Sequence, residues 1–344
     1  MSKNGTLLTV RNLRTHFFTE DGVVKAVDGV SFAIGKEQTF ALVGESGCGK
    51  SVTALSIMRL VPQPPGKIIA GEIIMEGQAL TGLTERQMRD VRGGRIAMIF
   101  QEPMTSLNPV FTVGSQIVEA IDLHRKLPRR QAKDLAVEML AQVGIPAPRQ
   151  RYKEYPHQLS GGMRQRAMIA MALSCDPELL IADEPTTALD VTIQSQILDL
   201  LRQIQASRGL SILLITHDLA VVAETADVVG VMYASKLAEL TDVATLYREP
   251  LHPYTQGLFR SLPRLGQKKE RLETIPGNVP NPLAFPTGCK FHPRCPAGCK
   301  LPRCRTDEPE LREVAPKHWV ACWECPGYEQ AQAADSTVVV GKEK

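Results

Sequence analysis

The sequence lacks a long apolar run and a strong excess of charge. No stretch approaches the roughly 18–20 apolar residues that cross a bilayer, and MSKNGTLLTVRNL at the start lacks the apolar core of a signal peptide. We therefore expect the chain to stay in the cytosol and not to span a membrane. The net charge of +3 comes from 40 basic and 37 acidic residues without a long basic run, which argues against nucleic acid as a partner.

Cysteine is scarce in most of the chain. Two of the eight cysteines, Cys48 and Cys175, lie in the first 250 residues, and the other six crowd into 289–325. In a reducing compartment a metal explains such a cluster better than disulfides do. No internal repeat is present, and 344 residues suffice for a full α/β core with a smaller appended domain.

The stretch GESGCGKS, residues 44–51, has the spacing G-x-x-x-x-G-K-[ST] of a phosphate-binding loop. In such a loop small residues expose backbone N–H groups to phosphate, the lysine reaches the β/γ oxygens, and the hydroxyl holds Mg²⁺. The apolar run 39–43 predicts a buried strand before it, and helical spacing over 54–61 predicts a helix after it. These flanks disfavour the alternative, a Gly-rich turn without a ligand.

Elsewhere, predicted strands alternate with predicted helices. Three short strands are expected within residues 7–34, with Asp-Gly turns at 21–22 and 28–29. A helical insertion is expected over about 104–174. Further strands are predicted at 71–75, 96–100, 179–182, 211–215 and 228–233. This alternation predicts an α/β fold whose parallel sheet is covered on both faces.

Three further segments carry groups suited to phosphate chemistry. LSGGM, residues 159–163, can open a helix with bare N–H groups ready for phosphate. In LLIADEP, Asp183 and Glu184 stand where a strand ends, so the first can serve Mg²⁺ and the second can orient or deprotonate a water. His217 ends the next strand, where side chains face the ligand crevice. The joint spacing of these motifs disfavours the alternative that Glu184 and His217 are ordinary polar surface residues.

With these motifs in order over residues 6–240, the chain resembles the ATP-binding cassette (ABC) family. The resemblance implies an N-terminal antiparallel β layer, a mostly parallel core sheet and a helical insertion. It also implies a dimer in which ATP lies between one subunit's phosphate loop and the other subunit's LSGG segment. Glu184 would be the catalytic carboxylate, His217 would hold the γ-phosphate, Lys50 would bind the β/γ-phosphates, and Gln101 would sense nucleotide.

The same resemblance implies the other ligand contacts. Mg²⁺ would be held by Ser51, Gln101 and Asp183. Phe17 would stack on adenine. The nucleotide would further be bound by Gly44, Glu45, Ser46, Gly47, Cys48, Gly49, Lys50, Ser51, Val52, Gln101 and Asp190, and by the opposite subunit's Ser160, Gly161 and Gly162.

The composition changes after about Leu240, where nine prolines fall between residues 250 and 296. This change predicts an ATPase domain over 1–240, a separate small Cys/Pro-rich domain over 241–327, and a frayed tail over 328–344. LHPYT at 251–255, IPG at 275–277 and the stretch 286–295 resemble the C-terminal extension of the ATPase subunits of dipeptide and oligopeptide permeases. Nickel permeases share a close relative of this pattern.

Two features of this C-terminal half depart from the family pattern. The resemblance implies that Cys289, Cys295, Cys304 and Cys322 hold a [4Fe–4S] cluster, although four thiolates also suit zinc and free thiols remain an alternative. The additional Cys299 and Cys325 leave the ligand identities open. Ser235 stands where we expect glycine, and a turn that needs φ > 0 would be mildly strained there.

The resemblance implies an ATPase subunit of an importer, most simply of dipeptides or oligopeptides. Its expected partners are two transmembrane permease subunits, a second cassette ATPase that forms a heterodimer with it, and an extracytoplasmic peptide-binding protein, with no nucleic acid. The chain would sit on the cytoplasmic face of the inner membrane. One alternative is the ATPase subunit of an importer of another solute, such as a nickel chelate. Another is a soluble cassette ATPase that acts on nucleic acid or ribosomes, and the presence of a single cassette disfavours it. The presence of Glu184 disfavours a nucleotide-binding regulator.

Overall fold

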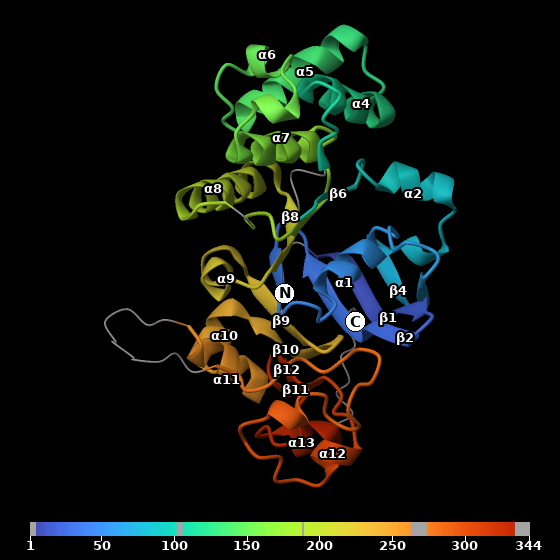
Figure 1. Ribbon diagram of the computed structural model, residues 1–344, viewed down its shortest axis with the longest axis vertical. Helices are drawn as coiled ribbons and strands as arrows, with labels where there is room; N and C mark the ends of the chain where they lie inside the picture. Colours follow the sequence, from blue (N-terminus) through green and yellow to red (C-terminus); the bar gives the residue numbers. More distant parts are fainter. Residues whose placement is uncertain (1–4, 102–105, 188, 263–273, 334–344) are drawn as a thin grey trace. The chain divides into compact units, whose positions relative to one another are not determined.

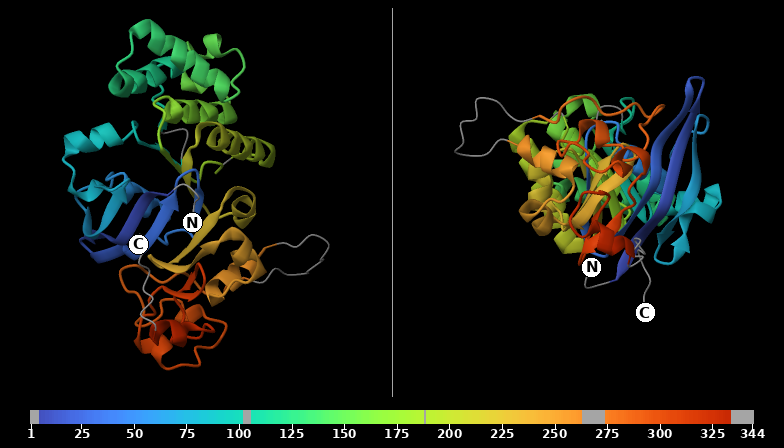
Figure 2. Two further views of the ribbon diagram at one scale, coloured as in Figure 1. Left: turned by 180° about the vertical axis from the view of Figure 1, so that it is seen from behind. Right: turned by 90° about the horizontal axis from the view of Figure 1, so that it is seen from below.

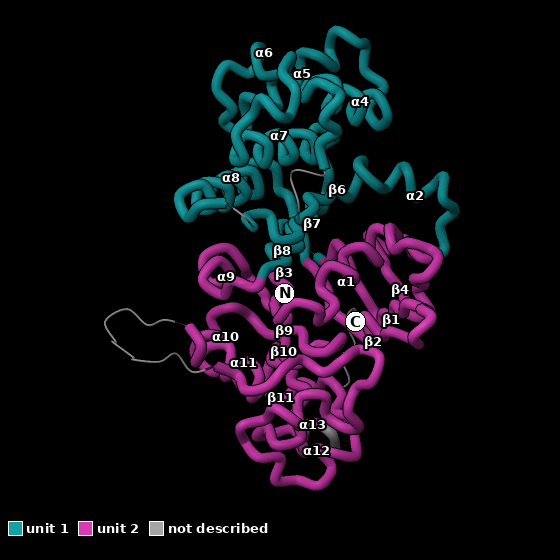
Figure 3. The backbone as a smooth tube through the Cα atoms, viewed as in Figure 1, with its two compact units in different colours: residues 1–5, 35–39, 82–216 teal, residues 6–34, 40–81, 217–344 magenta. Residues whose placement is uncertain are grey.

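The structure is a computed structural model, and it describes residues 5–101, 106–187, 189–262 and 274–333. The backbone forms two compact units, shown in Figure 3. Unit 1 comprises residues 1–5, 35–39 and 82–216, and unit 2 comprises residues 6–34, 40–81 and 217–344. Within the described residues, no helix has the length and apolar character needed to cross a bilayer.

Unit 1 contains three parallel strands: β6 (Ile96–Ile99), β7 (Leu179–Asp183) and β8 (Ser211–Thr216). Leu179 of β7 lies opposite Ile96 on one side and Ser211 on the other, which fixes the register. Every residue of β7 and β8 is buried, as expected for parallel strands covered on both faces. The strands predicted from the apolar runs are confirmed here.

The helices of unit 1 include a packed group that interrupts the strand succession (Figures 1 and 2). It contains α4 (Val113–Arg125), α5 (Arg129–Gln142), α6 (Pro148–Arg151) and α7 (Gly161–Leu173). The predicted insertion starts at about residue 104, and residues 102–105 lie outside the described part of the chain. The other helical elements of unit 1 are α2 (Glu85–Val91), η2 (Pro156–Gln158) and α8 (Val191–Arg208). The short element η1 (Leu80–Gly82) begins in unit 2 and ends at the first residue of this segment of unit 1.

Unit 2 begins with an antiparallel layer in the order β2-β1-β4-β5. Its strands are β1 (Thr6–Thr19), β2 (Gly22–Gly35), β4 (Gly66–Met75) and β5 (Gln78–Ala79). β1 and β2 are long neighbouring strands, drawn in blue in the right-hand view of Figure 2. In the β1–β4 ladder Leu8 lies opposite Met75 and Phe17 opposite Gly66.

The prediction of three short strands here was wrong at one turn. The first turn forms at residues 20–21, one position before the predicted 21–22, but Asp28 and Gly29 lie inside the single strand β2. Gly29 keeps the left-handed φ of a turn residue, 87°. Asp28 is nonetheless held in place, because its N–H donates to Ser235 O at 2.9 Å and its carboxylate lies 3.8 Å from Lys290 Nζ. These long-range contacts keep the strand continuous.

The second set of strands in unit 2 includes part of the C-terminal tail. β3 (Thr39–Val43) pairs in parallel with β9 (Val228–Tyr233), and β9 pairs antiparallel with β10 (Lys236–Asp242). β10 pairs with β12 (His318–Val320), which pairs with β11 (Arg312–Ala315). The helical elements of unit 2 are α1 (Lys50–Ile57), α9 (Leu219–Thr225), α10 (Val243–Arg248), α11 (Pro253–Arg260), η3 (His292–Arg294), α12 (Arg303–Thr306) and α13 (Tyr328–Ala333).

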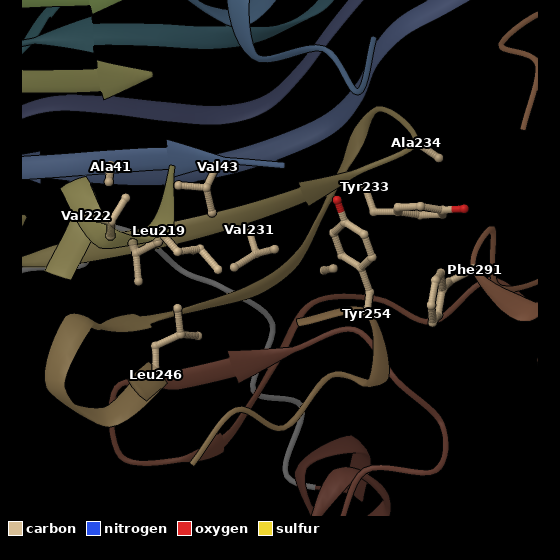
Figure 4. Packing of buried hydrophobic residues seen from close by; sticks show 12 residues of the cluster. Ala41, Val43, Leu219, Val222, Val231, Tyr233, Ala234, Leu246, Tyr254 and Phe291 are labelled. Carbon is tan, nitrogen blue, oxygen red and sulfur yellow. The ribbon is translucent and has the colours of Figure 1, made fainter. Parts of the chain in front are cut away.

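The tail shares a hydrophobic core with the strands that precede it. Tyr254 and Phe291 are buried in one cluster with Ala41, Val43 and Val231 (Figure 4). Aromatic side chains from the Pro-rich segment thus fill the core beside β3 and β9. The domain boundary near residue 240 stays a prediction.

Two local predictions about the C-terminal half have different outcomes. The expected positive φ at Ser235 is confirmed, with φ 74° there and 43° at Ala234. The frayed segment predicted from residue 328 is wrong for its first six residues, which form α13. Tyr328 is fully buried, its hydroxyl donates to Glu310 O at 2.6 Å, and its ring packs edge-on against Trp323. Residues 334–344 lie outside the described part.

Candidate functional site

The phosphate-loop sequence lies between β3 and α1 in unit 2, as predicted. Its backbone approaches neighbouring strands so closely that two glycines are required. A Cβ at Gly44, where φ is 151°, would lie 2.2 Å from Met232 O, and one at Gly49, where φ is 105°, would lie 2.2 Å from Ala26 O. Gly49 also caps α1 without a side-chain bond, which leaves the helix N-terminus to backbone N–H groups that suit an anion.

Lys50 lies inside this loop rather than on the protein surface. It is 5% exposed, and its Nζ donates to Gly44 O at 2.7 Å and to Glu45 O at 3.1 Å. Cys48 is also buried, and burial raises the pKa of its thiol despite the nearby Lys50 ammonium. A thiol with a raised pKa is a poor nucleophile, so Cys48 serves the loop as a small residue.

The other predicted residues of unit 2 occupy varied positions. Ser46 and Gly47 are exposed at the loop tip, and Ser51 and Val52 are half-buried in the first turn of α1. Phe17 lies on β1, partly exposed and opposite Gly66. His217 is exposed directly after β8, and the adjacent Asp218 caps α9 by accepting hydrogen bonds from Ala220 N and Val221 N. His217 is thereby fixed at a strand-to-helix junction.

In unit 1 the structure brings Gln101 and Glu184 together. Gln101 Nε2 donates to Glu184 Oε2 at 2.9 Å, and Thr187 Oγ1 donates to the same oxygen at 2.9 Å. The backbone of Glu184 has φ 46°, a conformation that residues other than glycine rarely adopt. Its N–H donates to Ile215 O on β8. Strained backbone of this kind is enriched at functional sites. Asp183, beside it, is 4% exposed at the end of β7.

Two predicted ligand-binding segments of unit 1 are helix N-termini. Ser160 caps α7 through its hydroxyl, which accepts from Met163 N, and Asp190 caps α8 in the same way from Ile193 N. Ser160 and Gly161 are exposed, whereas a Cβ at Gly162 would lie 2.9 Å from Ile193 Cγ2. The exposed Ser160 and Gly161 are therefore available to a second molecule.

Sequence analysis missed three residues at these sites. Thr187 is one of them, because its hydrogen bond to Glu184 has no signal in the local sequence. Arg294 and Tyr254 both contact Glu45 of the phosphate loop, across 249 and 209 residues of sequence. The motifs LHPYT and PRC that contain them were visible, but no local spacing connects either motif with the loop.

The tail cysteines gather around a small cavity in unit 2. The cavity, about 20 Å³ in volume, is lined by Cys289, Cys295, Cys299, Cys304 and Cys322, together with residues that include His292 and Glu324. Burial, reinforced by the neighbouring thiols, raises the pKa of Cys289 to about 11 and that of Cys299 to about 12. Within the described ranges, no group of three or more His, Cys, Asp or Glu side chains is arranged to hold a metal ion.

Two protein-family models match the chain. The model described as "ABC transporter" matches residues 27–187, and that described as "Oligopeptide/dipeptide transporter, C-terminal region" matches residues 238–304. The second match begins within β10 and includes the tail residues Tyr254 and Arg294.

Curated relatives match almost from end to end. The oligopeptide transport ATP-binding protein AppD of Bacillus subtilis is 52% identical over 328 residues, which cover 95% of this chain and 99% of AppD. The dipeptide transport ATP-binding protein DppD of Escherichia coli is 49% identical over 309 residues, which cover 90% of this chain and 94% of DppD.

Solved structures support the same fold. MJ0796, a dimeric bacterial ABC transporter cassette, has a TM-score of 0.62 at 24% identity, covering 69% of this chain and 99% of MJ0796. The Clostridium perfringens protein cbiO1, part of the ABC transporter complex cbiONQ, has a TM-score of 0.61 at 26% identity and covers 72% of this chain and 92% of cbiO1. The family models, the near-full-length relatives and the fold agree, and the chain belongs to the ABC transporter family as one of its ATP-binding, ATP-hydrolysing subunits.

Proposed function

We propose that this subunit drives the import of dipeptides or oligopeptides. The observation that carries the proposal is the tail: residues 238–304 match the C-terminal region of oligopeptide and dipeptide transporters, in the same chain as the cassette. The AppD and DppD relatives support it, because their likeness extends through this tail.

In this proposal residues 44–52 hold the phosphates of ATP and Lys50 neutralises the β/γ-phosphates. The close backbone approach at Gly44 and Gly49 supports this role, because a Cβ at either position would collide with the backbone of a neighbouring strand and displace the loop. Ser51, Gln101 and Asp183 supply hydroxyl, amide and carboxylate oxygens, the hard donors that Mg²⁺ prefers. Bound Mg²⁺ would neutralise charge that develops on the transferred phosphoryl group.

Glu184 is proposed to orient and deprotonate the attacking water. The two hydrogen bonds from Gln101 and Thr187 support this, since both hold the same carboxylate oxygen in place. Gln101 would sense nucleotide through the same contact. His217 would hold the γ-phosphate, Phe17 would stack on adenine, and Val52 and Asp190 would complete the nucleotide-binding set.

The active assembly is proposed to be an ATPase pair. Ser160, Gly161 and Gly162 of each subunit would contact the ATP bound by the other, and the exposure of Ser160 and Gly161 supports such a contact. The second ATPase would be a different cassette chain. Two transmembrane permease subunits would receive the pair on the cytoplasmic face of the membrane, and a peptide-binding protein outside would deliver the cargo.

We further propose that Cys289, Cys295, Cys304 and Cys322 take up a [4Fe–4S] cluster when iron and sulfide are supplied. The gathering of these thiols around one cavity supports the proposal, and their chemistry suits the group. Binding of the cluster would require deprotonation of the four thiols and rearrangement of the side chains that line the cavity. Iron and acid-labile sulfide are to be measured on protein purified without oxygen. About four of each per chain would support a cluster, whereas stoichiometric zinc or metal-free protein would exclude it.

The import proposal is tested by affinity purification of the tagged chain from detergent-solubilised membranes, with mass spectrometry of the co-purifying proteins. Two multispanning subunits and a second cassette ATPase would support the importer, and an associated peptide-binding protein would support the cargo. An associated metal-chelate-binding protein would overturn the peptide assignment alone. Ribosomes or purely soluble partners would overturn transport itself.

A further inference from the structure

An ion pair joins the phosphate loop to the tail within unit 2. Arg294 Nη1 donates to Glu45 Oε2 at 2.7 Å and Arg294 Nη2 donates to Glu45 Oε1 at 3.1 Å, so the contact is bidentate. Glu45 directly follows Gly44 in the loop, whereas Arg294 ends the short helical turn η3 beside Cys295. Bidentate contacts of this kind fix orientation as well as charge.

Arg294 is held rigidly on the tail side. Its side chain is 6% exposed, and its Nε donates to Pro276 O at 2.9 Å. Nη1 also lies 3.4 Å from the Tyr233 hydroxyl, and the guanidinium packs over the Tyr233 ring. The hydrogen bonds to Glu45 are the main reason why the pKa of Arg294 is raised. Arg294 therefore stays charged. The guanidinium therefore presents a fixed positive charge to the loop.

A second tail residue holds the loop backbone. The N–H of Glu45 donates to the Tyr254 hydroxyl at 2.9 Å. Tyr254 is fully buried, and its ring packs against Tyr233 and Phe291 with centroid distances of 4.6 and 5.4 Å (Figure 4). Its own backbone N–H is anchored by His252 Nδ1 at 3.0 Å. The tail thus bonds both the main chain and the side chain of Glu45.

We propose that Arg294 and Tyr254 are positioning residues through which the C-terminal tail sets the ATP affinity of the phosphate loop. The inference rests on the proposed role of residues 44–51 in phosphate binding. A carboxylate within this loop opposes an incoming polyphosphate, and Arg294 cancels that charge while it holds Glu45 in place. Tyr254 keeps the Glu45 N–H directed toward the tail, which selects one conformation of the loop.

The charge argument predicts an outcome that simple structural support does not. In Arg294→Met the unpaired Glu45 carboxylate weakens ATP binding by about tenfold, because a negative charge now stands close to the phosphates. In Glu45→Gln/Arg294→Met both charges are gone, and the dissociation constant returns to within about threefold of wild type. If Arg294 served only to keep the tail folded, adding Glu45→Gln to Arg294→Met would not restore the affinity for ATP.

The measurement is the dissociation constant of the full-length chain for a fluorescent ATP analogue with Mg²⁺. Arg312→Met is the matched control, because Arg312 is 12% exposed and pairs with Glu310 inside the tail. It should leave affinity unchanged. Unchanged affinity in Arg294→Met, equal weakness in the single and double variants, or an Arg312→Met defect as large as that of Arg294→Met would each overturn the proposal.

Two further variants complete the design. Tyr254→Phe keeps the ring but removes the acceptor for the Glu45 N–H, and we expect affinity to fall about threefold while kcat at saturating ATP stays unchanged. A fall in kcat with unchanged affinity would contradict positioning by Tyr254. Lys50→Ala tests the foundation: if it binds ATP normally, the phosphate-loop assignment itself fails, which is distinct from a failure confined to Arg294 and Tyr254.

Discussion

Gln101 and Glu184 lie 83 positions apart in the sequence, yet the Gln101 amide donates to Glu184 Oε2 at 2.9 Å. The Thr187 hydroxyl donates to the same oxygen. The carboxylate is therefore oriented by two side chains, one of which, Gln101, follows shortly after the end of β6 at Ile99. This arrangement links the proposed nucleotide sensor directly to the proposed general base.

Replacement of Glu184 should separate binding from hydrolysis. In Glu184→Gln the amide can still contact Gln101 and Thr187, but it cannot take a proton from water, so kcat should fall by at least about 100-fold. ATP affinity should stay within about threefold of wild type. Phosphate release and ATP binding are to be measured on the same preparation. Glu178→Gln, which alters a half-exposed carboxylate paired with Arg95, is the control and should retain full activity.

A Cβ at Gly44 should block the phosphate loop. Gly44→Ala would place the methyl group 2.2 Å from Met232 O at a φ of 151°, so the loop must shift. We expect the affinity for ATP to fall by at least about tenfold, with little change in the circular dichroism spectrum. Gly82→Ala, with no atom within 4 Å of the new Cβ, should behave like wild type. Normal ATP binding by Gly44→Ala would contradict the proposed cradle.

Ser235→Gly should stabilise the protein. Ser235 has φ 74°, is 1% exposed, and its Oγ has no hydrogen-bond partner among the described residues. Glycine would relieve the backbone strain and remove a buried, unsatisfied hydroxyl, and we expect a gain of about 1–2 kcal/mol in the free energy of unfolding. The gain is measured by urea denaturation. Ser235→Ala removes only the hydroxyl and should gain less; equal gains would show that the backbone is not strained.

Acid should destabilise unit 2 through His252. Burial lowers the pKa of His252 from 6.5 to about 4, although the Glu239 carboxylate opposes the shift. Between pH 6.5 and 4 the unfolded chain therefore binds more protons than the folded chain does. The contribution of neutral His252 to the free energy of unfolding is full above pH 6.5 and is lost as the pH falls toward 4. The loss should reach about 3 kcal/mol near pH 4.

The His252 contribution is isolated by comparing urea midpoints at pH 7.0, 5.5 and 4.5 in wild type and in His252→Asn. Asparagine can still cap α11 by accepting from Tyr254 N, so the variant should fold. Its midpoint should change less than that of wild type across this range. Equal slopes in the two proteins would assign the acid sensitivity to other groups.

The sequence was a sufficient guide where the signal was local. The apolar run of β3 followed by GESGCGKS identified the strand and the loop, and the positions of Asp183 and Glu184 at the end of β7 followed from LLIADEP. A helix after the loop was also expected, but α1 begins at Lys50 and ends at Ile57, so it stops short of the end of the range 54–61 over which the helical spacing was found. The positive φ of Ser235 was expected from the resemblance to the family, in which glycine is expected at this position.

Contacts between distant segments could not be predicted in the same way. The Arg294–Glu45 ion pair joins residues 249 positions apart, and the Asp28–Lys290 contact holds a strand where the dipeptide Asp-Gly favoured a turn. Helix α13 was missed because its polar sequence gives no local signal, and the burial of Tyr328 depends on Trp323 and Glu310. Tertiary packing overrode local propensity at each of these sites.

The central claim, ATP-driven peptide import, is tested most directly by the uptake of a radiolabelled dipeptide into cells that lack this chain. The account predicts that deletion abolishes the uptake of micromolar peptide, that the wild-type chain restores it, and that Glu184→Gln, produced to the same level, does not. Uptake that persists in the deletion strain, or that Glu184→Gln restores in full, would contradict the account.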